Sequence, residues 1–125
     1  MGNKKGAWVF IVIQSMVIVF HLWVIVGIIP FDKVWGGRLK SLSEMYKFEG
    51  LSILVNASFI GLVGMKVGIF RSLIKESVLD KVLWFIMLLF LLNTMGNLLA
   101  KTWMEKGFAV LSLASGYLVW RVRYR

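Results

Sequence analysis

Two ionisable side chains stand within apolar stretches of the chain, and both are of types that exchange protons or attract cations. Glu49 follows Phe48 at the start of an apolar run, and His21 is the only histidine among the 125 residues. Ionisable groups in such surroundings are costly, so they usually pair with one another or mark a pathway for ions or substrates. Histidine can also gain or lose a proton between about pH 5 and 8. Glu49 and His21 are therefore the pair that we expect to carry the chemistry of this chain.

Further polar side chains occur at helical spacing around this pair. At about 3.6 residues per turn, Glu49, Ser52 and Asn56 share one face of a helix, and Asn93 and Asn97 lie one turn apart on another. Such groups can replace the water that a solute loses when it leaves solution. We expect a polar vestibule that binds or conducts a small polar or ionic solute, formed by His21, Glu49, Ser52, Asn56, Asn93, Asn97 and Lys101.

The expected vestibule opens on the side opposite the chain termini. Counted along their helices, its residues lie at or beyond the midpoint on that side, whereas the terminal half holds only Gln14, Ser112 and Ser115 as polar residues within apolar sequence. A serine in a helix often bonds a carbonyl of its own helix, and we expect this of both serines. The uninterrupted apolar run from Leu83 to Leu92 is expected to close the vestibule below.

The same residues have a structural interpretation. Asparagines inside membranes often join neighbouring helices, with contributions of about 0.6 kcal/mol and at most about 2 kcal/mol each. A single histidine can equally be a neutral residue of the core. Under this alternative the chain is a non-transporting accessory or assembly protein that binds a partner membrane protein or lipid.

Four apolar segments must position these residues. Hydrophobic residues make up 59% of the chain and its mean hydropathy is +0.81, which exceeds what one small soluble core can bury. A helix needs about 20 apolar residues to cross a bilayer. We expect an all-α integral membrane protein, a single domain built as an antiparallel four-helix bundle, with spans at 7–29, 42–65, 78–100 and 103–120. The first span is too long for a signal peptide and has no small-residue cleavage pattern, so we expect it to be retained.

Most acidic residues have explanations at helix ends. Three segments match the capping box, in which a Ser or Thr side chain and an acid three residues later bond exposed amides at a helix start. They begin at Ser41, Ser77 and Thr102 and end at Glu44, Asp80 and Glu105. We therefore expect these three acids to be structural and the last three helices to begin near residues 42, 78 and 103.

Small residues form a second stripe on the helix that carries Glu49. Ala57, Gly61, Gly64 and Gly68 are spaced by four, three and four residues. Small side chains let the backbones of membrane helices approach closely, so this stripe is expected to be a helix-packing face. Because so small a chain encloses little volume, we also expect a homo-oligomer, with a dimer favoured.

The net charge of +9 indicates contact with lipid headgroups rather than with nucleic acid, because the Lys and Arg residues lie between and beyond the apolar segments. If both termini are cytoplasmic, nine of the 15 basic residues lie inside and six outside. The positive-inside rule therefore favours cytoplasmic termini in a bacterial cytoplasmic (plasma) membrane, although the small margin leaves dual topology open.

Several functional classes fit the sequence poorly. The first helix lacks the mid-helix carboxylate of small multidrug transporters, and 88–95 lacks the phenylalanine-rich motif of small fluoride channels. Asp32 and Asp80 lie at helix ends, unlike the aspartates of a membrane protease. With no cysteine and one histidine, a single chain offers too few ligands for a zinc site or a bis-histidine haem. We expect no metal, no cofactor and no enzymatic activity, with a membrane-embedded enzyme as the alternative.

Overall fold

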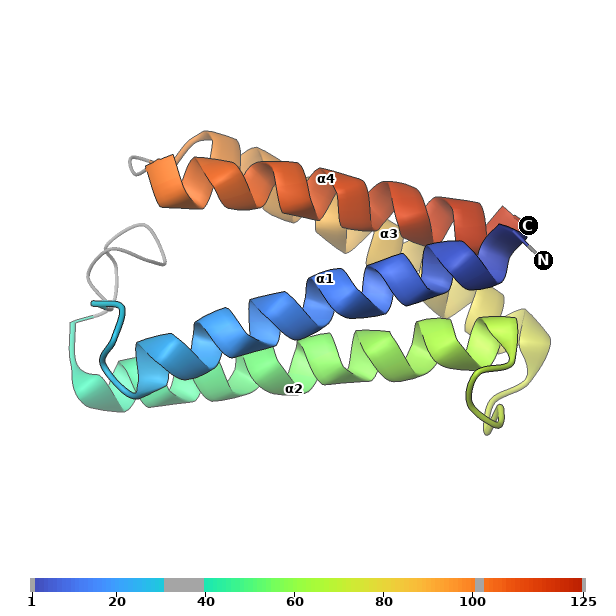
Figure 1. Cartoon of the computed structure of the whole chain (residues 1–125), viewed down its shortest axis with the longest axis horizontal. Coiled ribbons are helices and arrows are strands. Elements are labelled where there is room, and N and C mark those ends of the chain that lie inside the picture. Colours follow the sequence, from blue (N-terminus) through green and yellow to red (C-terminus); the bar gives the residue numbers. More distant parts are fainter. Residues whose placement is uncertain (1, 31–39, 101–102, 125) are drawn as a thin grey trace.

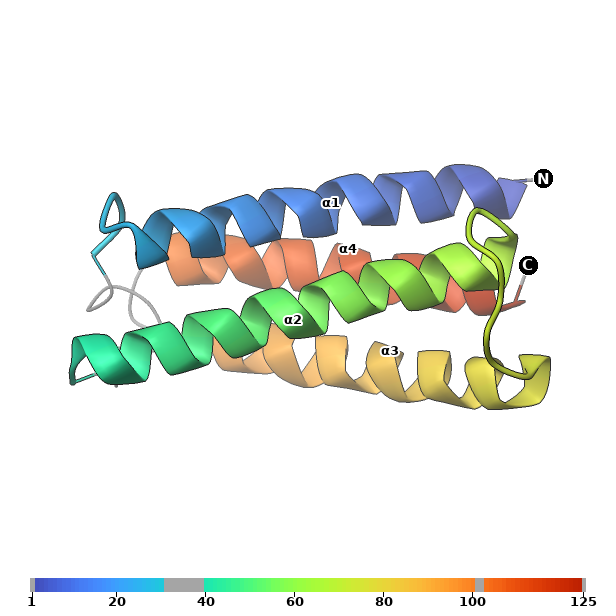
Figure 2. The ribbon, with the colours of Figure 1, turned by 90° about the horizontal axis from the view of Figure 1, so that it is seen from below.

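The protein folds into four helices. The computed structural model describes residues 2–30, 40–100 and 103–124, and these ranges contain no strand. The helices are α1 (Gly2–Ile25), α2 (Leu42–Val67), α3 (Glu76–Leu98) and α4 (Trp103–Tyr124). Consecutive helices run in opposite directions, and both termini lie at the same end as the α2–α3 connection (Figure 1, Figure 2). The predicted all-α fold of four helices is confirmed.

The four helices form two pairs that diverge. α1 packs along α2 and α3 packs along α4, whereas α2 makes few contacts with α3 or α4. The pairs lie close together near the termini and separate toward the opposite end (Figure 1). The bundle therefore has a closed half, which contains the termini, and an open half at the other end.

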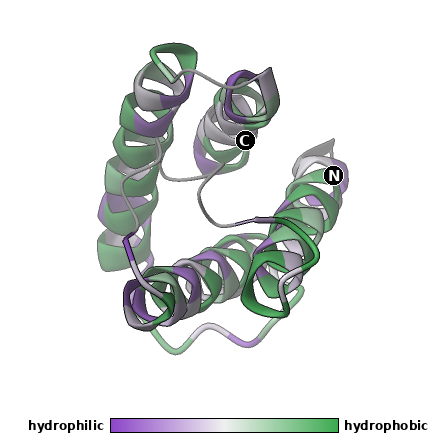
Figure 3. Cartoon of the chain, turned by 90° about the vertical axis from the view of Figure 1, so that its left-hand side faces the viewer, coloured by the Kyte–Doolittle hydropathy of each residue, from purple (hydrophilic) through white to green (hydrophobic). Residues whose placement is uncertain are grey.

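Three of the helices are long and apolar enough to cross a membrane. They are α1 from Lys4 to Ile25, α2 and α3, while α4 does not meet the same criterion within the described residues. The described part of α4 carries Glu105, Lys106, Arg121 and Arg123 near its two ends. Seen from the end opposite the termini, hydrophobic residues dominate the helices and hydrophilic ones form patches (Figure 3). These features are compatible with an integral membrane protein.

The closed half contains the main apolar core. Its buried residues come from all four helices, and the rings of Phe10 and Phe90 meet edge to face with centroids 5.8 Å apart. The cluster consists of Ala7, Phe10, Val63, Leu79, Leu83, Ile86, Phe90, Val119 and Val122. We call this cluster the apolar core. A much smaller buried cluster, Val24 and Met45, joins α1 to α2 in the open half.

The start of α2 follows its predicted cap in part. Ser41 Oγ accepts a hydrogen bond of 3.2 Å from the backbone N–H of Glu44. The Glu44 carboxylate accepts from the backbone N–H of Lys40 at 2.6 Å, one residue before the position that the capping box implies. The helix ends at Gly68, whose φ of 85° lies in the left-handed region that glycine adopts without strain.

The predicted capping box at Ser77 is wrong. α3 already begins at Glu76, and its N-cap residue, Lys75, makes no side-chain capping bond. Asp80 instead pairs with Arg123 at 3.1 Å and lies 3.8 Å from Lys66. The carboxylate is therefore used to join α3 to α4 and α2 rather than to cap its own helix. The third predicted box begins at Thr102, which lies outside the described residues.

The first helix ends earlier than its apolar sequence does. Although the predicted span extends to residue 29, α1 stops at Ile25, and Gly27 takes a φ of 88° in the turn that follows. The left-handed glycine, rather than Pro30, therefore marks the end of the helix. At its other end α1 begins at Gly2, so the basic residues Lys4 and Lys5 are part of the helix.

Candidate functional site

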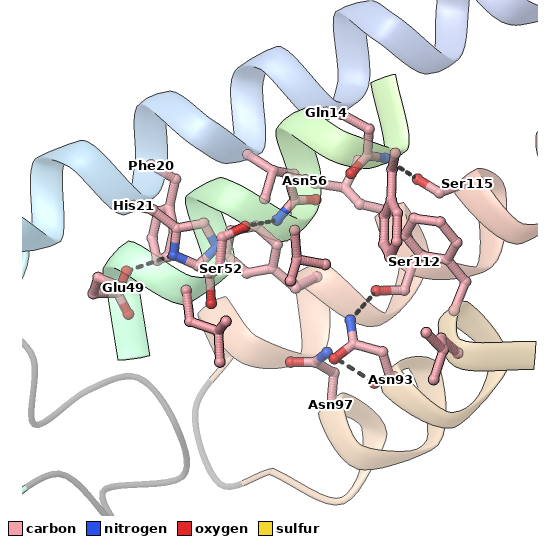
Figure 4. Close-up of a pocket in the computed structure, with 18 of the residues that line it drawn as sticks. Gln14, Phe20, His21, Glu49, Ser52, Asn56, Asn93, Asn97, Ser112 and Ser115 are labelled. Atoms are coloured by element: carbon pink, nitrogen blue, oxygen red, sulfur yellow. Dashed lines mark hydrogen bonds and ion pairs between the residues drawn. The ribbon is translucent and has the colours of Figure 1, made fainter. Parts of the chain in front are cut away.

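The open half contains a cavity of about 390 Å³ with walls from all four helices. Figure 4 shows its polar side chains pointing toward one another from α1, α2, α3 and α4. The polar lining consists of Gln14, His21, Glu49, Ser52, Asn56, Asn93, Asn97, Glu105, Ser112 and Ser115. All predicted vestibule residues that the structure describes thus line one cavity. Lys101, the remaining predicted member, lies outside the described residues.

A close histidine–carboxylate pair joins α1 to α2 at the cavity wall. His21 Nδ1 and Glu49 Oε1 are 2.5 Å apart (Figure 4), and the Glu49 side chain is fully buried while that of His21 is 15% exposed. An ionised carboxylate only accepts hydrogen bonds, so with Glu49 ionised the hydrogen is on Nδ1. A bond to a charged group is stronger than one between neutral groups. Both residues of the pair belong to the lining of the cavity.

Two of the asparagines bond their own helices. Asn56 Nδ2 donates to the carbonyl of Ser52, and Asn97 Nδ2 donates to the carbonyl of Asn93, each at 2.8 Å. A backbone carbonyl can only accept, so the atom facing it must be the amide nitrogen. The side-chain oxygens of Asn56 and Asn97 are then the atoms that can accept a bond from a solute.

Two hydrogen bonds between side chains link neighbouring helices around the same cavity. Gln14 Nε2 donates to Ser115 Oγ at 2.7 Å, joining α1 to α4, and Asn93 Nδ2 donates to Ser112 Oγ at 2.6 Å, joining α3 to α4. The sequence predicted that both serines bond their own helix; the bonds that the structure shows for their hydroxyls instead come from other helices. Gln14, Ser112 and Ser115 consequently line the cavity rather than lying apart from it.

Glu105 is a cavity residue that the sequence analysis missed. Assigned there to a helix cap, it is only 8% exposed and lies on the cavity wall. A signal was present in the spacing: Glu105, Phe108, Ser112 and Ser115 are separated by three, four and three residues and so share one face of α4. All four residues line the cavity.

Aromatic rings form much of the apolar lining. The ring centroids of Phe20 on α1 and Phe108 on α4 are 4.6 Å apart, and those of Phe59 on α2 and Phe90 on α3 are 5.3 Å apart. Phe90 also belongs to the apolar core, so it forms the boundary between the cavity and the closed half.

The small-residue stripe of α2 makes few contacts within the chain. Ala57 is exposed, and a Cβ added at Gly61 would meet nothing within 4 Å. A Cβ at Gly64 would lie 2.3 Å from the Phe70 ring, and Gly68 forms the C-cap. Gly64 thus makes room for Phe70 and Gly68 caps the end of α2. Packing of the stripe against a second copy stays a prediction.

Comparison with known proteins identifies no relative. No protein-family model, no curated protein and no solved structure matches the chain. Within the described residues, no group of three or more His, Cys, Asp or Glu side chains is arranged to hold a metal ion. The functional argument therefore depends on the geometry of the cavity.

Proposed function

We propose that this chain is an integral membrane protein whose open-half cavity binds a small polar or ionic solute. The observation that supports this most strongly is the buried Glu49 carboxylate, 2.5 Å from His21 at the wall of a 390 Å³ cavity. An ionisable pair within a membrane costs free energy, and such pairs usually mark a site or pathway for ions or substrates. Ligand sites are typically concave and largely apolar, with a few polar groups that converge on the ligand.

The proposed mechanism uses the pair and the amides in different roles. The Glu49 carboxylate attracts a cationic group or exchanges a proton with the His21 imidazole. The side-chain oxygens of Asn56 and Asn97 accept bonds that the solute made with water. Lys101 would complete the set at the mouth of the vestibule, as the sequence suggests.

Passage of the solute across the membrane requires the closed half to open. The apolar core lies between the cavity and the terminal end, and six of its nine buried residues lie on α3 and α4. The geometry therefore supports binding directly, and conduction only with a rearrangement of the two helix pairs. We assign the apolar core the role of a gate.

We place all four helices across the bilayer, including the less apolar α4, with both termini in the cytoplasm of a bacterial cell. The described cations Lys4, Lys5, Arg71 and Lys75 then lie at the cytoplasmic surface. The open face of α2 at Ala57 and Gly61 is our proposed contact in a homodimer. Fusion reporters at the two termini test the topology, and mass measurement in native nanodiscs tests the dimer.

A high-resolution structure in lipid nanodiscs near neutral pH tests the binding proposal. We expect non-protein density, either ordered water or a solute, in the cavity lined by Asn97 and the His21–Glu49 pair. Side chains that fill this cavity and leave no space in it would contradict the proposal.

One observation favours the accessory alternative. The Gln14–Ser115 and Asn93–Ser112 bonds join helices and have the form expected of polar residues that only hold a bundle together. Under this alternative, Glu49→Gln and His21→Ala lower stability and affect nothing else. Under the binding proposal, both variants fold but lose the solute. We propose neither a cofactor nor a catalytic step for either function.

A further inference from the structure

We propose that the ligand of the open-half cavity is a small organic cation, in which an ammonium group is attached to an apolar body. This inference rests on the proposed binding function and specifies its ligand. The cavity volume of about 390 Å³ is the first argument. Pockets for organic ligands span about 300–1,000 Å³, whereas a bare inorganic ion would leave most of such a cavity empty.

The charges on the wall favour a cation over an anion. Glu49 on α2 and Glu105 on α4 both line the cavity, and no Lys or Arg of the described ranges does so. His21 is the only described lining group that can be positive. An anionic ligand would lose its hydration while facing the Glu49 carboxylate, whereas an ammonium group would be attracted to it.

The aromatic rings favour an organic cation over a metal ion. Phe20 and Phe108 meet on one side of the cavity, and Phe59 and Phe90 meet on another. Ring faces attract ammonium groups by about 0.5–2 kcal/mol and give an apolar body surfaces to pack on.

The cavity reaches the surface where α2 and α3 make few contacts. Its exposed lining residues lie on these two helices: Leu51 is 56% and Leu89 37% exposed. In the membrane proposed above, this surface faces lipid tails. A ligand with an apolar body can dissolve there and enter from the side as well as through the mouth of the vestibule, whereas a hydrated inorganic ion can enter only through the mouth.

Calorimetry on the full chain in nanodiscs tests this proposal, with empty nanodiscs as the blank. Benzyltrimethylammonium is the probe, tetramethylammonium is the cation without a ring, benzyl alcohol is the neutral aromatic molecule, and K⁺ is the inorganic cation. We expect the probe to bind about tenfold or more tightly than each of the three, because each lacks at least one attractive contribution, and tenfold corresponds to about 1.4 kcal/mol.

Matched variants locate the site. Glu49→Gln should weaken binding of the probe by about tenfold or more, whereas Glu76→Gln, which removes the same charge from an exposed position outside the cavity, should not change it. Should Glu49→Gln fail to fold, Phe108→Leu provides the second test, with an expected loss of about threefold or more. Equal binding by benzyl alcohol, tetramethylammonium or K⁺ would overturn the organic-cation assignment.

The outcome also separates this inference from the binding function itself. If no cation binds while the nanodisc structure shows water or another solute in the cavity, the ligand class is wrong and the binding function stands. If the cavity is dry and collapsed in that structure, both proposals fail.

Discussion

The closed and open halves of this bundle use polar residues in opposite ways. In the closed half, charged groups stay at the end of the helices, where Lys66, Asp80 and Arg123 pair across three helices, and the interior is apolar. In the open half the interior itself is polar, with Glu49 fully buried beside His21. The same four helices thus hold together where apolar side chains interlock and separate where polar groups face inward. Under the proposed function, stability and binding depend on different ends of the molecule.

Removing volume from the closed half should have the largest effect on stability. Leu83 is fully buried in the apolar core, so Leu83→Ala leaves a cavity. Such changes cost about 2–5 kcal/mol in soluble proteins, and we expect the lower end because lipid also solvates leucine. Reversible unfolding in mixed micelles measures the loss. Leu92→Ala, at a position 65% exposed, is the control, and an equal loss there would contradict the assignment of the core.

The end of α2 should be the next most sensitive point. A Cβ at Gly64 meets the Phe70 ring at 2.3 Å, so in Gly64→Ala the ring must move, at an expected cost of about 1–3 kcal/mol. Gly61→Ala adds the same methyl group where nothing lies within 4 Å and should cost little. Combining Gly64→Ala with Phe70→Ala should remove most of the penalty in the same unfolding assay. A cost that persists in the double variant would mean that Phe70 is not its cause.

The ion pairs at the closed end should matter less than the core beneath them. Asp80 is 35% exposed and lies near Lys66 and Arg123, and pairs at such sites contribute about 0.2–1 kcal/mol. Asp80→Asn should therefore lower the free energy of unfolding by about 1 kcal/mol or less, and high salt should reduce the difference. An effect as large as that of Leu83→Ala would show that charges, rather than apolar packing, hold this half together.

The polar contacts between helices in the open half should make the smallest contribution to the free energy of unfolding. A double-mutant cycle with Gln14→Leu and Ser115→Ala isolates their 2.7 Å bond, and the expected coupling is about 0.6 kcal/mol. A coupling well above about 2 kcal/mol would favour the accessory alternative, in which these residues serve only to join helices.

Much of this organisation could be predicted from the sequence because it depends on local patterns. The apolar runs located four helices, and Ser41 indicated the start of α2. The presence of ionisable side chains within apolar runs also singled out Glu49 and His21, which the structure places 2.5 Å apart. Such features follow from periodicity and from the position of a residue along its own helix.

The features that the sequence misassigned depend on neighbours distant in the chain. Asp80 fits a capping motif, yet its partners come from helices 14 and 43 residues away in sequence, counted to Lys66 and Arg123. Ser112 likewise accepts a hydrogen bond from Asn93 of a neighbouring helix. A short motif does not specify which partner a carboxylate or a hydroxyl finds once the helices pack together.

Accessibility of introduced cysteines to a charged, membrane-impermeant thiol reagent tests the central claim most directly. The chain has no cysteine, so each single variant reports one position without background. Ser52→Cys lies on the cavity wall, Leu54→Cys is exposed on the outer surface of α2, and Val119→Cys lies in the apolar core. Thiol modification requires ionisation in water, so we predict that Ser52→Cys reacts about tenfold or more faster than both others. Equal and slow modification of all three would contradict a cavity that is open to solutes.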